Sequence, residues 1–363
     1  MTTTDHALQP PASAPLLPAE ETGVAFDWPR IAAYLAEQGY RLDPGFTPRR
    51  FVGGLANVNM LLRVDDGWAV LRRPPPGPLP KGAHDMAREH KVLNALGPHL
   101  AIAPQSILFC EDESVAGAPF QLLAYHEGRV VRGGDISPLP PTAETGVALS
   151  AMLVDTLASI HAVDTETAGL SDLGRPEGFL TRTAKGWIAR AASILNGERP
   201  AACAAVVDWL EAQDQEEANA PVLLHNDFKL DNIILAKDAI APHKVIDWDM
   251  ATRGDPMMDV ATLLSYWTEA DDPECMLKLD QMPTAGQGFM RREQAAMAYA
   301  ERTGRSLEGF LFPRVLAIFK LGVVFLQLRA LGAQNAKASA RIDAVNPHEL
   351  FQFALDVAHG KRF

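Results

Sequence analysis

Cysteine is scarce in this chain of 363 residues. Its three cysteines, Cys110, Cys203 and Cys275, lie far apart, and the sequence contains no Cys-x-x-Cys pair. An odd and scattered set excludes a disulfide framework and a clustered zinc site. It is typical of a protein from a reducing compartment, so we expect a cytoplasmic location.

Basic residues are outnumbered, since 33 Lys and Arg stand against 45 Asp and Glu and give a formal net charge of -12. Proteins that bind nucleic acid through its phosphates need an excess of cations, so we exclude nucleic acid as a partner. The hydrophobic content of 47% and charged content of 21% are those of a globular protein. At roughly 100–200 residues per domain, the length predicts two structural units or one bilobed unit.

Long apolar runs are also missing. The most apolar late stretch, Val315–Leu328, contains Lys320 and is shorter than the ~20 residues that cross a bilayer, so it predicts a buried helix and no membrane role. The first residues have neither the basic segment nor the apolar core of a signal peptide. Residues 1–26 are rich in Pro, Ala and Thr and are predicted to form a flexible tail.

Two regions with different patterns follow the tail. Residues 27–127 predict antiparallel strands with one inserted helix, and Asp65-Asp66-Gly67 is a hairpin signal between two of the strands. Residues 128–363 predict mainly long helices, interrupted by one β-rich island over 222–248. A first helix is predicted to begin at the capping residue Asp27 and to end near Gly39. The predicted strands lie near 50–52, 58–64, 68–72, 106–110 and 120–125, and the further predicted helices near 83–96, 146–161, 201–212, 257–267, 291–300 and 315–330.

The β-rich island carries most of the polar groups that suggest chemistry. Asp227, Lys229 and Asn232 lie in a loop between two apolar runs, and Asp247 and Asp249 follow another strand. Phosphoryl transfer needs in-line positioning and divalent cations on the phosphates. Asp227 would accept the proton of an incoming hydroxyl, Lys229 would neutralise the transferring phosphoryl group, and Asn232 and Asp247 would bind Mg²⁺.

These segments resemble a known family. The run His225-Asn226-Asp227-Phe228-Lys229, with Asn232 and then Ile246-Asp247-Trp248-Asp249, is similar to the catalytic segment of the aminoglycoside phosphotransferase/choline kinase family of protein-kinase-like enzymes. Together with the run VLRRPPPG over 70–77, it looks closest to kinase domains associated with acyl-CoA dehydrogenases. The resemblance covers residues 45–330.

The resemblance implies a bilobed α+β protein-kinase-like fold, with a small antiparallel-sheet N-lobe over 27–127 and a larger, mainly helical C-lobe over 128–363. It implies that Asp227 is the catalytic base, that His225 braces the loop, and that Asn232 and Asp247 are metal ligands. Asp249 would reach a second metal or hold the loop. The family usually has glycine where this chain has Asn226.

A nucleotide site is expected in the N-terminal part, with ATP and Mg²⁺ as cofactors. The resemblance places phosphate contacts on a glycine loop and on the residue that replaces the usual strand lysine, and places adenine against a hydrophobic strand residue and a hinge segment. The residues so assigned are Gly53, Gly54, Asn57, Val70, Arg72, Leu123, Ala124 and Tyr125.

Glu89 enters this set through helical spacing. Met86, Glu89, Leu93 and Leu96 fall on one face of a helix, so Glu89 lies on an otherwise apolar stripe. A buried carboxylate is costly unless it is paired, and Arg72 is the expected partner. The alternative is an exposed ion pair of little energetic weight.

The preferred function is a phosphotransferase that moves the γ-phosphate of ATP to a hydroxyl of a small molecule, either a hydroxyacyl compound or an aminoglycoside-like compound. A catalytically inactive nucleotide-binding pseudokinase and a metallohydrolase built on His225 and Asp227 are the competing hypotheses. A protein substrate is disfavoured because no Ala-Pro-Glu signature follows Asp247. The oligomeric state is left open by the sequence.

Overall fold

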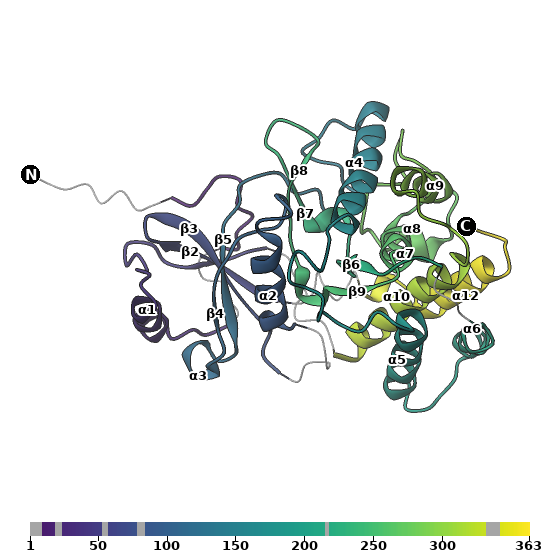
Figure 1. Ribbon diagram of the computed structural model, residues 1–363, viewed down its shortest axis with the longest axis horizontal. Coiled ribbons are helices and arrows are strands. Elements are labelled where there is room, and N and C mark those ends of the chain that lie inside the picture. Colours follow the sequence, from purple (N-terminus) through teal and green to yellow (C-terminus); the bar gives the residue numbers. More distant parts are fainter. Residues whose placement is uncertain (1–8, 19–23, 53–56, 78–83, 215–217, 332–341) are drawn as a thin grey trace, which may run out of the picture. The chain divides into compact units, whose positions relative to one another are not determined.

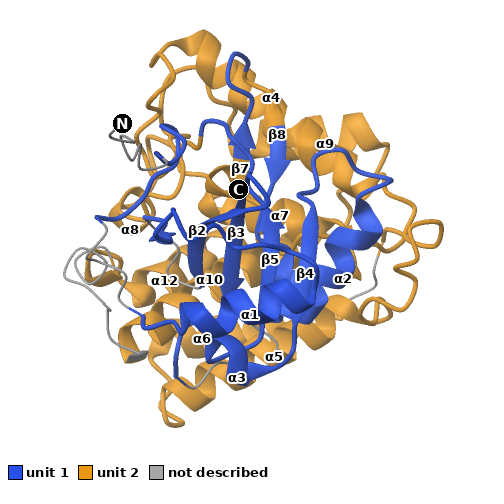
Figure 2. Cartoon of the chain, turned by 90° about the vertical axis from the view of Figure 1, so that its left-hand side faces the viewer, with its two compact units in different colours: residues 1–129, 234–239, 243–251 blue, residues 130–233, 240–242, 252–363 orange. Residues whose placement is uncertain are grey.

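The computed structural model describes residues 9–18, 24–52, 57–77, 84–214, 218–331 and 342–363. The chain divides into two compact units (Figure 2). Unit 1 contains residues 1–129, 234–239 and 243–251, and unit 2 contains residues 130–233, 240–242 and 252–363. Within the β-rich island, Asp247 and Asp249 therefore belong to unit 1, and the loop around Asp227 belongs to unit 2. The predicted division after residue 127 lacks this interleaving, because it rested on element order along the chain.

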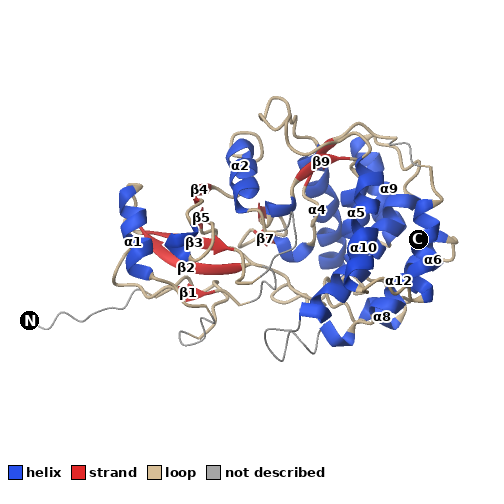
Figure 3. Ribbon diagram, turned by 90° about the horizontal axis from the view of Figure 1, so that it is seen from below, coloured by secondary structure: helices blue, strands red, loops and turns tan. Residues whose placement is uncertain are grey.

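Unit 1 is built on a five-stranded antiparallel sheet (Figures 1 and 3). Its strand order is β1-β2-β3-β5-β4, with bounds β1 Arg49–Arg50, β2 Val58–Val64, β3 Gly67–Arg73, β4 Ser106–Cys110 and β5 Phe120–Ala124. The predicted hairpin is confirmed, since Val58 pairs with Arg73 and Val64 with Gly67. Asp65 and Asp66 at its tip both have positive φ, as a tight hairpin turn requires.

Three helices accompany this sheet, where the sequence had predicted an initial helix and one insertion. They are α1 Trp28–Glu37, α2 Met86–Leu96 and the short α3 Glu113–Ala116. Asp27 caps α1 as expected, by accepting a hydrogen bond from the backbone of Arg30. Ile31 and Leu35 of α1 join Met60, Leu62 and other alternate strand residues in one hydrophobic core.

Part of the N-terminal tail is bound to the sheet. Leu17 donates from its backbone N–H to the carbonyl of Arg50 (2.8 Å), and Val52 donates to Pro15 (2.6 Å). The Arg49 guanidinium also donates to the Leu17 carbonyl. The sequence predicted a flexible tail over 1–26, but residues 15–17 instead extend the sheet at β1, because strand pairing satisfies backbone groups whatever the side-chain composition.

Unit 2 is mainly helical. Its helices are α4 Ala143–His161, α5 Phe179–Ile194, α6 Ala201–Glu211, α7 Met257–Tyr266, α8 Glu274–Leu277, α9 Arg292–Thr303, α10 Leu311–Leu331 and α12 Pro347–Ala358. The sequence did not predict α5, α8 or α12. Two short strands of unit 2, β6 Val222–Leu224 and β9 Thr252–Gly254, pair antiparallel. The strands β7 Ile233–Leu235 and β8 Pro242–Val245, most of whose residues belong to unit 1, pair with each other.

Two helices, Ala143–His161 and the stretch Leu311–Ala330 of α10, are long and apolar enough to span a bilayer by length and composition alone. The sequence had judged the second stretch too short, and the structure corrects this because α10 begins four residues earlier than predicted. Of the apolar windows of these helices, 56% and 72% is buried inside the protein, respectively. Arg314 and Lys320 are among the residues that α10 buries.

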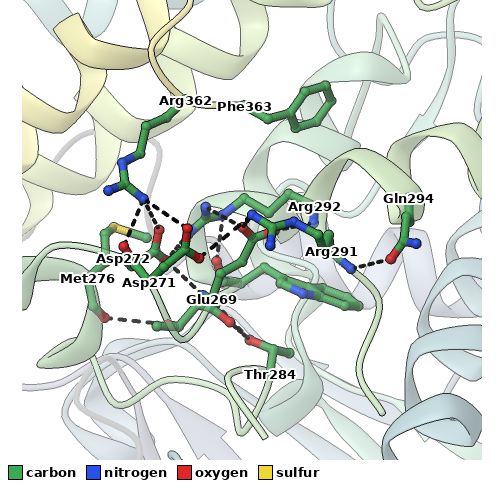
Figure 4. A network of polar contacts seen from close by, with 12 residues as sticks. Glu269, Asp271, Asp272, Met276, Thr284, Arg291, Arg292, Gln294, Arg362 and Phe363 are labelled. Carbon is green, nitrogen blue, oxygen red and sulfur yellow. Dashed lines mark hydrogen bonds and ion pairs between the residues drawn. The ribbon is translucent and has the colours of Figure 1, made fainter. Parts of the chain in front are cut away.

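A polar network holds the segment between α7 and α9 (Figure 4). The buried Arg292 donates from Nε to the carbonyl of Trp267 (2.8 Å) and pairs with Asp272 and Glu269. Trp267 is itself fully buried, with its indole N–H donated to Met290. Trp267 is therefore a packing residue.

Candidate active site

The loop that carries Asp227 is fixed locally by short regular elements. It follows β6 and leads into a 3-10 turn, η1 (Leu230–Asn232), and then β7. Asn226 has φ of 66°, a left-handed conformation that favours glycine and that asparagine tolerates best among the other residues. This backbone geometry explains how asparagine stands where the related family usually has glycine.

Two buried charged side chains form hydrogen bonds with the backbone of Asn226. Asp259 of α7 accepts hydrogen bonds from the N–H groups of His225 and Asn226, each at 2.7 Å. Lys320 of α10 donates from Nζ to the Asn226 carbonyl at 2.8 Å. Both helices thus define the path of the loop just before Asp227. The sequence analysis did not identify the role of Lys320.

His161 completes the support of Asp259. Its Nε2 lies 3.2 Å from Asp259 Oδ2 and its Nδ1 2.5 Å from the Tyr299 hydroxyl. Burial lowers the pKa of His161. Burial alone would raise the pKa of Asp259, but hydrogen bonding and charge interactions with His161 and His225 bring it below its ordinary value. His161 is thus a buried histidine with a hydrogen-bond partner at each ring nitrogen.

The carboxylate of Asp227 has three neighbours in unit 2. Lys229 Nζ lies 3.3 Å from Oδ2, and Asn232 Nδ2 lies 2.9 Å from the Asp227 carbonyl and 3.4 Å from Oδ2. The Tyr266 hydroxyl donates to Oδ1 at 3.0 Å. His225 accepts at Nδ1 from the Asp227 backbone N–H (3.3 Å), a contact that suits the predicted bracing role. The sequence analysis did not identify Tyr266.

Arg72 is the centre of the polar cluster in unit 1. It donates from Nε to Glu89 Oε2 at 2.8 Å, pairs with Asp247, and lies 3.7 Å from Asp249 Oδ2. Met86, Glu89, Leu93 and Leu96 are all buried, as the helical stripe predicted. The Arg72–Glu89 contact is thus a buried pair, and the surface alternative is wrong. Glu89 also accepts from the backbone N–H of Trp248 at 3.0 Å.

Three carboxylates therefore share one arginine. Burial of Arg72 alone would lower its pKa, but Asp247, Glu89 and Asp249 raise it overall, so Arg72 stays charged. Burial and the nearby Asp247 raise the pKa of Asp249 to about 7. With two more negative than positive charges when all are ionised, the cluster has the electrostatic character that suits a divalent cation.

The donor set fits Mg²⁺ in particular. Asp247 and Asp249 offer carboxylate oxygens, and Mg²⁺ is commonly held by one or two carboxylates with waters and substrate phosphates. Within the described ranges, no group of three or more His, Cys, Asp and Glu side chains is arranged to hold a metal. Asn57 donates from Nδ2 to Asp249 Oδ2 at 3.2 Å, which links one predicted nucleotide residue to one predicted metal ligand.

The predicted adenine-binding residues lie on two paired strands. Val70 of β3 is opposite Leu123 of β5, and both are half-buried. The N–H of Ala124 donates to Gln105 and that of Tyr125 to Trp68, at 3.0 and 3.1 Å. The backbone N–H groups of these two residues are therefore engaged within unit 1, which the sequence could not reveal.

The catalytic, nucleotide-binding and metal-binding roles assigned to these residues from the sequence stay predictions. Gly53 and Gly54 lie outside the described residues. Asn232 belongs to unit 2 and Asp247 to unit 1, so their predicted binding of Mg²⁺ also remains a prediction.

Comparison with known proteins gives a family match. A model described as the phosphotransferase enzyme family matches residues 47–295, more than half of the chain. The acyl-CoA dehydrogenase family member 11 of Rattus norvegicus is 29% identical over 307 residues, which are 82% of this chain and 38% of the rat protein. The acyl-CoA dehydrogenase family member 10 of Mus musculus is 26% identical over 318 residues, which are 86% of this chain and 29% of the mouse protein. The chain thus spans well under half the length of these relatives.

Solved structures give the fold. A Ralstonia eutropha protein provisionally named an aminoglycoside phosphotransferase superposes with a TM-score of 0.72 at 23% identity, covering 93% of this chain and 99% of that one. A thermostable mutant of the aminoglycoside phosphotransferase APH(4)-Ia, in ternary complex with AMP-PNP and hygromycin B, gives a TM-score of 0.59 at 16% identity and covers 91% and 99% of the two chains. The predicted α+β protein-kinase-like fold is confirmed.

Proposed function

Since this chain belongs to the phosphotransferase enzyme family, we propose that it transfers the γ-phosphate of ATP, with Mg²⁺, to a hydroxyl group of a small molecule. The observation that carries the proposal is the buried cluster in which Arg72 faces Glu89, Asp247 and Asp249. A fixed cation and an excess of carboxylates are what a metal–triphosphate needs, because the arginine contacts phosphate oxygens while the carboxylates hold the metal.

The proposed role of each residue follows from the polar contacts described within its own unit. Mg²⁺ would neutralise charge on the β- and γ-phosphates and would be held by Asp247, Asn232 and, as a second contact, Asp249. Arg72 would bind phosphate oxygens, with Glu89 fixing its orientation. Asp227 would take the proton of the acceptor hydroxyl as its oxygen bonds to the γ-phosphorus and the bond to ADP breaks. Lys229 would stabilise the phosphoryl oxygens.

Adenine would lie against Val70 and Leu123. Because the N–H groups of Ala124 and Tyr125 are engaged in the sheet, we assign to their carbonyl oxygens the contact with the adenine amino group. Gly53 and Gly54 keep their proposed contact with the phosphates.

Two acceptor classes enter the proposal. The curated relatives are named as acyl-CoA dehydrogenase family members, which favours a hydroxyacyl acceptor. One structural neighbour was crystallised with hygromycin B, which favours an aminoglycoside-like acceptor. The acidic balance of this chain suits a cationic ligand of the second kind.

The test is a screen of hydroxyl compounds from both classes, with ADP release as readout and mass spectrometry to identify the phosphorylated product. We expect Asp227→Ala to lower kcat by roughly 10²–10⁴-fold while ATP binding persists. Asp238→Asn removes an exposed carboxylate from a turn and is the matched control. Wild-type turnover by the Asp227 variant would remove Asp227 from the role of catalytic base. The absence of any phosphorylated product from the wild-type protein would contradict the proposal and favour a nucleotide-binding pseudokinase.

The metal assignment has its own test. Asp247→Ala should abolish the tightening of ATP binding by Mg²⁺, measured by calorimetric titration with and without the metal. An unchanged dependence on Mg²⁺ would remove Asp247 from the ligand set.

A further inference from the structure

Tyr266, the last residue of α7, lies against the loop that carries Asp227. Its hydroxyl donates to Asp227 Oδ1 at 3.0 Å, and Lys229 Nζ lies 4.9 Å from the centroid of its ring. One side chain thus contacts both of the residues that the proposed function places at the reacting atoms. The phenol interacts with the base through a hydrogen bond and with the ammonium group through a cation–π contact.

The two oxygens of Asp227 are held in different ways. Oδ1 is bound by Tyr266, whose ring has few rotatable bonds and whose helix is anchored beside the loop, because Asp259 of the same α7 accepts from His225 and Asn226. Oδ2 lies 3.3 Å from Lys229, a side chain with four flexible methylene groups, and has a longer contact of 3.4 Å with Asn232 Nδ2. Burial, together with the nearby Asp227, raises the pKa of Tyr266, so its hydroxyl keeps the proton that it donates.

We propose that Tyr266 is a positioning residue for phosphoryl transfer, which fixes Oδ1 of Asp227 and so presents Oδ2 to the acceptor hydroxyl. This inference rests on the proposed function. Lys229 leaves Oδ2 for the transferring phosphoryl group when the substrates bind. The acceptor proton then passes to Oδ2, the acceptor oxygen bonds to phosphorus, and the electron pair of the broken bond leaves with ADP.

The direct test is Tyr266→Phe, which removes the hydroxyl and keeps the ring beneath Lys229. We expect kcat to fall roughly 10–100-fold, the effect of losing one hydrogen bond to a charged group, with the KM for ATP unchanged. Tyr266→Leu removes the ring as well and should lower kcat further. Tyr40→Phe removes a tyrosine hydroxyl from the part-buried edge of the unit 1 core and should leave kcat at the wild-type value.

A double-variant comparison separates positioning from a general effect on the fold. In an Asp227→Asn background, single-turnover rates should change by no more than about twofold when Tyr266→Phe is added, because the carboxylate that Tyr266 orients is already gone. Rates are taken per ATP-binding protein, so a partly unfolded variant still gives a valid result. An equal fall in both backgrounds, or unchanged kcat in Tyr266→Phe alone, would overturn the inference. Wild-type turnover in Asp227→Asn alone would remove Asp227 from the role of base and overturn the inference with it, whereas the absence of any phosphorylated product from the wild-type protein would overturn the proposed function.

Discussion

The Nε of Arg72 lies 2.8 Å from Oε2 of Glu89, and both side chains are almost completely buried, with 6% and 1% of their surfaces exposed. A strand residue and a helix residue 17 positions apart thus form an ion pair inside unit 1. Asp247 and Asp249 lie beside it, so Arg72 compensates more than one buried negative charge.

Removing this arginine should therefore be costly. We expect Arg72→Met to lower the free energy of unfolding by about 3–5 kcal/mol, since it leaves buried carboxylates without their cation. Arg72→Lys should cost less, because it keeps the charge and loses the forked geometry. Urea denaturation measures both, and Arg41→Met, which breaks an exposed pair with Asp66, should change little. Equal stability of Arg72→Met and the wild type would show that the pair is not needed to keep the cluster folded.

Replacing Lys320 should lower kcat without a comparable loss of thermal stability. Lys320→Met removes the donor to the Asn226 carbonyl but avoids the cost of burying an ammonium group, so the melting temperature should change little. We expect kcat to fall roughly tenfold, because the loop before Asp227 loses one of its two anchors. Steady-state kinetics and thermal unfolding check this, with the partly exposed Lys278→Met as control. A variant as active as the wild type would assign Lys320 to packing alone.

Two helix glycines should respond to alanine in opposite directions. A Cβ on Gly146 of α4 would lie against backbone atoms of Gln287 and Phe289, too close for van der Waals contact, so Gly146→Ala should destabilise by about 1–3 kcal/mol. Gly186 of α5 has open space around it, and Gly186→Ala should stabilise by about 0.5–1 kcal/mol. Chemical denaturation of the pair tests the helix packing, and changes of the same sign would contradict it.

His126 predicts a loss of stability in acid. Burial lowers its pKa to about 4, and Lys244 and His243, which face it, act in the same direction. Below about pH 6.5 the unfolded chain binds a proton at His126 that the folded protein excludes. The free energy of unfolding therefore decreases as the pH drops, and the decrease due to His126 is complete near pH 4. The slope due to one such proton is at most about 1.4 kcal/mol per pH unit.

The measurement is the free energy of unfolding of wild type and His126→Phe between pH 4 and 7. The variant should have the shallower dependence on pH, while the exposed His359→Gln should retain the wild-type slope. Parallel curves for wild type and His126→Phe would show that His126 titrates alike in both states.

The sequence predicted those features of the fold and site that local patterns determine. Helical spacing put Glu89 on the buried stripe of α2, and alternating apolar runs located the strands on either side of the Asp227 loop. The hydrogen bond from Tyr266 to Asp227 spans 39 positions and the one from Lys320 to Asn226 spans 94. Such contacts are fixed by how α7 and α10 pack, and no periodicity along the chain encodes them.

Helix α5 was missed for a related reason. Its sequence FLTRTAKGWIARAASI contains threonines and Gly186, which weaken intrinsic helix propensity. Packing against α10 stabilises α5 despite this weak propensity, since tertiary burial contributes most of the stability of a protein helix.

The backbone pairing of residues 15–17 with β1 has a practical consequence for handling this protein. Composition alone would suggest a shortened version that starts at Asp27. That version would lack the backbone hydrogen bonds that residues 15–17 make at the β1 edge of the sheet. Bare strand edges template intermolecular association, so such a truncation should precipitate or dimerise at concentrations that the longer chain tolerates.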